Sequence, residues 1–361
     1  MRYDGKNFTI MQLNHRQSRR ALFFLLTIGG MMLLPRAYAA SCTTSAQMTA
    51  AQRDAMANTA RSMAANVESG DVQALRANTI PAVAADFGAI ASSVESLKPL
   101  IQHATITVDA LYFLDASTEP ANAPQTSFYC GSPIVVLNIP NLPPGKYALA
   151  ILHATGVPQP QQIALILSET GTDQWKLAGF FSSPMVEDGH DGLWYWTRAR
   201  EFAQKKMDWN AWFYYQTAAA LLDPVDFLTS PNLEKLRREA NSVRPANLPE
   251  SKPLVLTVNG SPFEINGIDT TTALGGYDLE FYYTPNAEQT AQLRDPTAAR
   301  KQVVDLMSAL LAIHPELRQG FRGIWAHAQS GNVSIFALDL PMNQIGGGAQ
   351  TTSATAAPAA H

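Results

Sequence analysis

Cysteine, histidine and charged residues are scarce in this chain of 361 residues, which has two cysteines, seven histidines and 16% charged residues. The sequence also lacks the G-x-S-x-G turn, the H-E-x-x-H and C-x-x-C pairs and the phosphate-binding glycine loop. A formal net charge of −4, with no basic run in the body of the chain, argues against nucleic acid as a partner. We therefore expect no cofactor and no nucleic-acid ligand.

What is present describes a globular chain. Apolar residues make up 46% of the sequence, which is enough to build a sizeable core, and the length allows two or three domains.

The first 39 residues have the pattern of a signal peptide. Arg16, Arg19 and Arg20 precede an apolar run over 21–34 that is too short for a bilayer span, and the small-x-small sequence Ala37–Ala39 follows. We expect cleavage near Ala40, a periplasmic or secreted protein, and no transmembrane anchor after cleavage.

The two cysteines allow two interpretations. In an oxidising compartment Cys42 and Cys130 predict one disulfide. Alternatively, residues 39–42 form a bacterial lipobox without its usual leucine, and Cys42 is then lipid-anchored with Cys130 free. We favour the disulfide.

Periodicity over residues 40–184 predicts helices followed by an antiparallel sheet, which is an α+β arrangement. The predicted helices cover 49–67, 71–77 and 81–97, and the predicted strands cover 105–114, 128–139, 147–154, 162–168 and 175–181.

The motif Ser69-Gly70-Asp71 between helices and the closing strand 175–180 resemble the nuclear-transport-factor-like superfamily over about residues 45–183. That resemblance implies a cone-shaped domain whose curved sheet wraps around its helices. The superfamily includes isomerases, dehydratases and non-catalytic modules, so the fold alone assigns no function. Its catalytic members place Asp, His or Tyr in the cone, where Asp109, Tyr112 and His153 are the candidates.

Residues 189–224 hold four of the six tryptophans and predict two helices folded on each other. One apolar stripe contains Trp196, Ala199, Ala203 and Met207, and the second contains Trp212, Tyr215, Ala219 and Leu222. Asp208 is the expected N-cap of the second helix, and Ser230-Pro231 the expected start of a third.

This stretch resembles one tetratricopeptide repeat within residues 185–245. Trp196, Ala199, Ala211, the pair Tyr214-Tyr215 and the closing 222–224 follow the pattern, whereas Arg200 and Met207 stand where the repeat usually has glycine. With no second copy in the chain, the unit must pack against its neighbours, because solenoids need about three repeats. Aromatic residues at helical spacing predict core packing; the alternative is a groove for a peptide or glycan with Trp194, Tyr195, Trp209 and Tyr214 as its candidates.

A third domain is expected at 253–343. A hairpin over 254–258 and 262–268 turns at Asn259-Gly260, followed by a strand over 277–283, a helix over 296–314 and a hairpin over 321–338. The low-complexity residues 344–361 are expected to be disordered.

The loop over 187–192 (EDGHDG) is the best chemical candidate in the sequence. Asp188, His190 and Asp191 are possible metal ligands or groups that position water, although their spacing fits no zinc or calcium motif. The alternative is a solvated linker in which Asp191 caps the next helix.

Three functions remain open from the sequence. We favour an exported bacterial envelope protein that binds a protein partner or small ligand without catalysis. The alternatives are an isomerase-like or hydrolase-like enzyme with its site in the first-domain cone, and a glycan-binding protein that uses exposed tryptophans.

Overall fold

The computed structural model describes residues 40–132, 134–331 and 333–346. The described residues all belong to one compact unit. The predicted signal peptide and residues 347–361 of the predicted tail lie outside the described part. The fold class is α+β, as the sequence predicts.

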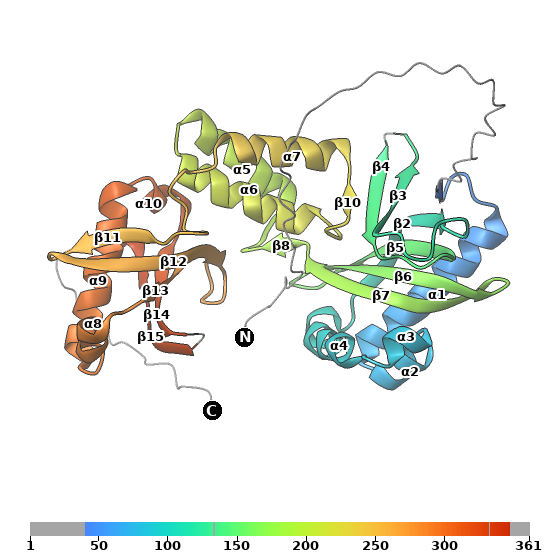
Figure 1. The fold of residues 1–361 in the computed structure, drawn as a ribbon, viewed down its shortest axis with the longest axis horizontal. Helices are drawn as coiled ribbons and strands as arrows, with labels where there is room; N and C mark the ends of the chain where they lie inside the picture. Colours follow the sequence, from blue (N-terminus) through green and yellow to red (C-terminus); the bar gives the residue numbers. More distant parts are fainter. Residues whose placement is uncertain (1–39, 133, 332, 347–361) are drawn as a thin grey trace, which may run out of the picture. The chain divides into compact units, whose positions relative to one another are not determined.

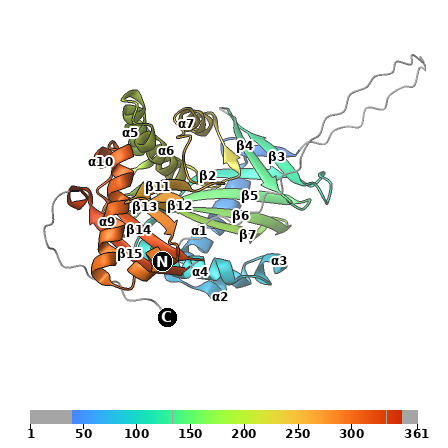
Figure 2. The same ribbon diagram turned by 60° about the vertical axis from the view of Figure 1, so that its left-hand side comes forward.

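The first part of the chain builds a five-stranded antiparallel sheet in the order β1-β2-β5-β6-β7. Its strands are β1 (Ser41–Thr44), β2 (Thr105–Asp115), β5 (Lys146–Thr155), β6 (Gln161–Gly171) and β7 (Gln174–Pro184). One face packs against helices, as Figures 1 and 2 show. These helices are α1 (Ala50–Ser69), α2 (Val72–Ala77), α3 (Pro81–Ala84) and α4 (Gly88–Ile101).

The opposite face of this sheet packs against a smaller sheet in the order β10-β4-β3. Its strands are β3 (Gln125–Cys130), β4 (Val135–Pro140) and β10 (Leu228–Thr229). The sequence pattern predicts one strand over 128–139, and this is wrong: the chain forms a hairpin. Gly131 takes a φ of 65° between the two strands, a conformation that glycine adopts without steric cost.

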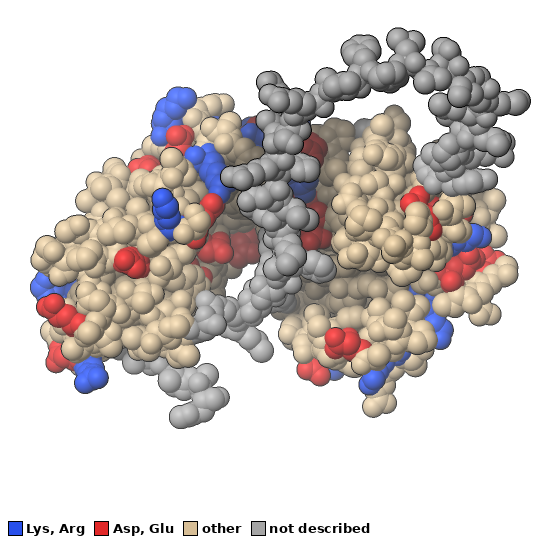
Figure 3. Space-filling model, viewed as in Figure 1, with Lys and Arg blue, Asp and Glu red and all other residues tan. Residues whose placement is uncertain are grey.

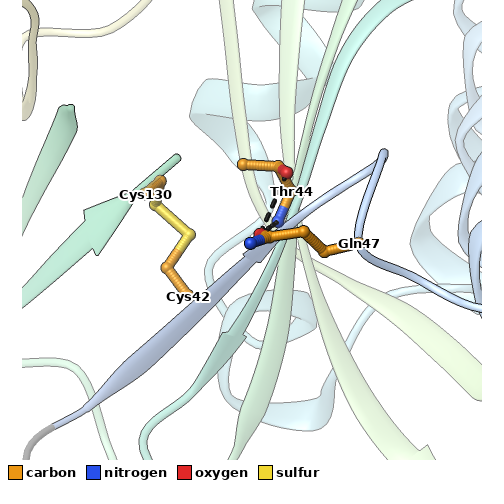
Figure 4. The surroundings of a disulfide bond; sticks show 4 residues. All are labelled: Cys42, Thr44, Gln47 and Cys130. Carbon is orange, nitrogen blue, oxygen red and sulfur yellow. Dashed lines mark hydrogen bonds between the residues drawn. A yellow bond between two sulfur atoms is a disulfide. The ribbon is translucent and has the colours of Figure 1, made fainter. Parts of the chain in front are cut away.

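A disulfide joins Cys42 to Cys130, with the two Cα atoms 5.1 Å apart (Figure 4). It connects β1, at the edge of the first sheet, to the end of β3. Near it, the Thr44 backbone N–H and hydroxyl both donate to Oε1 of Gln47 at 3.1 Å. A lipid anchor would need a free Cys42 sulfur, and in this structure that sulfur is bonded to Cys130.

The aromatic-rich stretch forms α5 (Gly192–Gln204) and α6 (Asp208–Leu222), followed by α7 (Pro231–Ser242). Helix α6 is buried on nearly every side, so the single apolar stripe predicted from the sequence covers only part of its buried surface. Trp212 and Ala219 of that stripe are half-buried, whereas Trp209, Phe213 and Tyr214, which lie outside it, are buried. Asp208 is the first helical residue and not the N-cap, because Lys206 turns the chain at a φ of 60° and Met207 precedes the helix.

The Glu239 carboxylate of α7 holds the three helices together. Its Oε2 accepts hydrogen bonds from Trp196 Nε1 at 2.7 Å, Arg200 Nε at 2.7 Å and the Tyr215 hydroxyl at 3.4 Å. Its Oε1 accepts a second bond from Arg200 at 2.9 Å. The pKa of Glu239 is lowered: burial acts to raise it, but the hydrogen bonds from Arg200 and Trp196 outweigh that effect.

The last part of the chain is a five-stranded sheet in the order β11-β12-β13-β14-β15. Its strands are β11 (Leu254–Val258), β12 (Ser261–Thr271), β13 (Asp278–Thr284), β14 (Gly323–Ser330) and β15 (Val333–Pro341). Helix α9 (Pro296–Ile313) lies along one face (Figure 1), and α8 (Ala287–Gln292) and α10 (Leu317–Gly320) are short. The Asn259-Gly260 turn is confirmed, with φ of 51° and 83°.

This domain continues beyond its predicted end. A 3₁₀ turn, Met342–Gln344, follows β15, and Ile345 is buried at 2% exposure. The core of this domain also contains the rings of α5 and α6, including Tyr195, Phe202 and Tyr214. The α5–α6 rings therefore pack mainly against the C-terminal sheet, whereas Val225, Leu228 and Leu233 join the core of the small sheet.

The predicted helix over 81–97 is divided into α3 and α4. The chain leaves the helical pattern at 85–87, where the ring of Phe87 is buried in the core between helices and sheet. Three short elements are absent from the sequence prediction: helix α8 and the paired strands β8 (Val186–Glu187) and β9 (His190–Asp191).

Within the described residues, no helix combines the length and the apolar character needed to cross a bilayer. The face in Figure 3 consists mostly of uncharged residues with charges of both signs scattered over it, in keeping with the charged fraction of the sequence.

Replacing both cysteines by serine is expected to lower the free energy of unfolding by about 4 kcal/mol, because the bond closes a loop with a sequence separation of 88. Urea denaturation of the chain from residue 40 measures the change. Reduced wild-type protein should match the variant; a loss of less than about 1 kcal/mol would contradict the prediction.

Glu239→Gln is expected to lower stability at pH 7 by about 1–3 kcal/mol, because it removes a charged acceptor of several hydrogen bonds. The pKa of Glu239 is lowered from 4.5, so its contribution is present above pH 4.5 and lost as the pH falls through the folded-state pKa. Unfolding curves between pH 7 and 3 should show the wild-type advantage shrinking. Glu95→Gln, at an exposed position of α4, is the control and should change little; an advantage for wild type that persists unchanged at pH 3 would refute this assignment.

Candidate functional site

A cavity of about 420 Å³ is formed where three segments meet. The turn between β5 and β6 contributes Pro158, Gln159 and Gln161. The end of β7 and the β8–β9 hairpin contribute Pro184 and residues 186–189, and the loop between β12 and β13 contributes Thr272, Gly275 and Gly276. We call it the hairpin cavity. Among the described residues, its lining includes the acidic residues Glu187 and Asp188 but no lysine or arginine.

The β8–β9 hairpin gives the cavity its acidic side. Asp188 and Gly189 occupy left-handed conformations, with φ of 47° and 75°, between the paired residues Glu187 and His190. Asp-Gly is a preferred pair for such two-residue turns. The loop that the sequence left open between a metal site and a solvated linker is therefore a tight hairpin whose tip carries Asp188.

Glu187 connects this hairpin to its surroundings. Its Oε1 accepts a hydrogen bond from the Thr272 hydroxyl, and its backbone carbonyl accepts one from the Tyr195 hydroxyl at 3.1 Å. The hairpin is thus attached to the β12–β13 loop on one side and to α5 on the other.

Asp191 and His190 have structural partners. The Asp191 carboxylate accepts from the Trp194 backbone N–H at 2.8 Å and caps α5, which is the alternative that the sequence offered. The His190 ring lies parallel to the Trp194 indole, with centroids 3.7 Å apart. Among the described residues no group of three or more His, Cys, Asp or Glu side chains is placed to hold a metal ion.

A group of tyrosines lies behind the hairpin. Burial raises the pKa of Tyr195, with neighbouring phenols and the carboxylates of Asp188 and Glu187 adding to the effect. Burial raises the pKa of Tyr214 to about 12, which Arg198 opposes and Asp188 increases. These phenols stay protonated near neutral pH and act as donors: Tyr214 donates to the Gly320 carbonyl at 2.6 Å.

Most of the aromatic residues that the sequence offers as ligand contacts are core residues. Tyr195, Trp209 and Tyr214 are buried, and their rings pack against one another or against the C-terminal domain. Trp194 is the exception, because 38% of its surface remains exposed.

The catalytic candidates of the first domain are partly brought together. His153 Nε2 lies 3.1 Å from Gln162 Oε1, and its Nδ1 lies 3.7 Å from Asp109, which sits at a bulge in β2. Burial raises the pKa of Tyr112, and the charge of Asp109 raises it further by a smaller amount. Tyr112 packs into the core on the sheet face away from α1 and α4, and none of the three residues lines the hairpin cavity.

Sequence reasoning missed Gln159, Gln161 and Thr272 as site residues. Each lies at the end of a strand or in a connecting turn, and the sequence carries no signal that three such segments meet. The one available signal was the acidic segment 187–192 itself, which the sequence left open between a metal site and a solvated linker.

Asp191→Ala is expected to lower the free energy of unfolding by about 1 kcal/mol, since it removes the cap of α5, whereas Asp191→Asn should be nearly neutral because asparagine caps equally well. Thermal or urea unfolding distinguishes the two variants. Equal losses for alanine and asparagine would show that the negative charge of Asp191, and not its capping oxygen, is what matters.

No protein-family model, no curated protein and no solved structure matches the chain.

Proposed function

We propose that this chain is an exported bacterial envelope protein that binds a small ligand in the hairpin cavity without catalysing a reaction on it. The observation that carries the proposal is the cavity itself, where polar residues from three separate segments line a space of about 420 Å³. Ligand sites are usually concave and have a few polar groups that fix orientation.

Export is supported by two features. The N-terminal 39 residues have the charge, apolar run and small-residue pattern of a signal peptide, and the disulfide suits an oxidising compartment. A periplasmic or secreted location is therefore part of the proposal.

The fold resemblances remain part of the proposal as well. Helices on one face of an antiparallel sheet support a nuclear-transport-factor-like first domain, and the α5–α6 pair supports a single tetratricopeptide-like unit that packs against neighbours. Neither resemblance assigns the ligand.

The two other functions have less support from the geometry. An isomerase-like or hydrolase-like site would need Asp109, Tyr112 and His153 around a common space, and a glycan surface would need several exposed aromatic rings. The hydroxyls of Tyr195 and Tyr214 donate hydrogen bonds to backbone carbonyls, which gives them a structural role.

The test is a ligand screen with protein-observed NMR on the chain from residue 40, repeated on Gln159→Trp. Gln159 is exposed at the rim of the cavity, so a large ring there should fill the opening and weaken every specific ligand by at least about tenfold, while the fold is retained. Gln292→Trp, at an exposed position of α8, is the matched control.

Retained binding in Gln159→Trp, or equal loss in both variants, would refute the cavity as the ligand site. Turnover of a ligand by the wild type would refute the absence of catalysis.

A further inference from the structure

Strand β3 is an edge strand of the small sheet, and among the described residues it has a hydrogen-bonded neighbour strand on one side only (Figure 1). At one end of the β3–β4 pair the Asn141 N–H donates to the Pro124 carbonyl at 3.1 Å, and the Asn138 N–H donates to the Phe227 carbonyl, on the side of β10, at 2.8 Å. Hydrogen-bonded pairs alternate along an antiparallel ladder, so every second residue of β3 bonds to β4. The residues between them direct their N–H and C=O groups away from the sheet: Gln125, Ser127 and Tyr129.

The rest of the strand is held in place. Thr126, Phe128 and Cys130 are at most 1% exposed and face the core between the two sheets. The disulfide from Cys130 to Cys42 fixes the end of the strand to β1. The outward groups therefore form a fixed edge and not a loose segment.

The other strand edges in the described part of the chain are protected. The edge of β7 is covered, because the Ile80 N–H donates to the Leu177 carbonyl at 2.9 Å and the Leu177 N–H donates to the Asn78 carbonyl at 2.8 Å. Strand β15 carries Asp339, β11 follows Pro253, and β1, β8, β9 and β10 have at most four residues each. Charges, proline and short length are the usual ways to keep an edge from pairing. Strand β3 has no charge and no proline.

The edge of β3 is complementary to itself. Residues 120–145 contain no charged side chain, although the whole chain has a net charge of −4, so two copies can meet there without repulsion between like charges. The outward residues are spaced evenly about Ser127. Antiparallel pairing around a two-fold axis at Ser127 therefore places this residue opposite its counterpart and Gln125 opposite the second Tyr129, with about six backbone hydrogen bonds in all.

We propose that β3 pairs antiparallel with β3 of a second copy of this chain, which joins the two three-stranded small sheets into one sheet around a two-fold axis at Ser127. The side chain of Tyr129, which is 66% exposed in the single chain, then lies beside Gln125 of the other copy. The inference does not rest on ligand binding in the hairpin cavity.

The first experiment is sedimentation velocity on the chain from residue 40, with its disulfide intact, between about 1 and 500 μM. The ladder is short, so we expect a weak dimer with a dissociation constant of about 10–100 μM. Hydrogen exchange followed by NMR identifies the surface. The amides of Gln125, Ser127 and Tyr129 should exchange several-fold more slowly at the high concentration, because dimerisation gives them acceptors.

A charge exchange at the axis tests the pairing itself. Ser127→Lys and Ser127→Glu should each stay monomeric at low salt, because like charges would stand directly opposite each other. An equimolar mixture of the two variants should dimerise, since opposite charges then face each other. Thr257→Lys, at an exposed position of the edge strand β11, is the matched control and should dimerise as the wild type does.

A wild-type chain that stays monomeric at every concentration would overturn the proposal, as would a dimer in which the three β3 amides gain no protection. Dimerisation of either Ser127 variant alone, or loss of the dimer in Thr257→Lys as well, would have the same meaning. If both Ser127 variants unfold at the wild-type temperature and their mixture stays monomeric, the antiparallel pairing at Ser127 is wrong. Should a Ser127 variant fail to fold, the exchange rates of the wild-type amides decide.

Discussion

The Glu239 carboxylate is the interaction on which the middle of the molecule depends. One side chain on α7 accepts hydrogen bonds from Trp196 and Arg200 of α5 and from Tyr215 of α6. Since α7 follows directly on β10, which pairs with β4, fixing α7 against α5 and α6 also fixes the connection to the first domain. A charge held this way is stabilising only while its partners remain, because an unpaired carboxylate in the same place would be costly.

The same helical pair is attached to the C-terminal domain by hydrogen bonds to backbone carbonyls. Asn210 donates to the Glu316 carbonyl at 2.6 Å and Tyr214 donates to the Gly320 carbonyl at 2.6 Å. These bonds satisfy carbonyls around the short helix α10, where few intrahelical partners exist. Gly320 has no room for a side chain, since a Cβ there would lie 2.9 Å from Asn210. Polar and apolar contacts together therefore fix the position of α6 in this core.

The hairpin cavity follows from this arrangement. Helix α5 begins at the cap residue Asp191, directly after the β8–β9 hairpin, and the Tyr195 hydroxyl one turn later holds the Glu187 carbonyl. The position of Asp188 in the cavity is therefore set by the helix whose Trp196 and Arg200 side chains are bonded to Glu239. The acidic side of the cavity is therefore supported by a helix and not by a free loop.

The sequence alone determined the α+β class, most helix and strand spans, the cap at Ser230 and the Asn259-Gly260 turn, because these depend on local periodicity and on the conformations that single residues prefer. It offered the cap at Asp191 as one of two alternatives. It also suggested the Cys42–Cys130 pair. The tertiary structure decided what depends on distant segments. These features are the division of 128–139 at Gly131, the burial of α6 on nearly every side, the role of Arg200 as the partner of Glu239, and the meeting of Gln161, Asp188 and Thr272 around one cavity. Local patterns carry no information about which turns come together, since that is set by the packing of whole elements against each other.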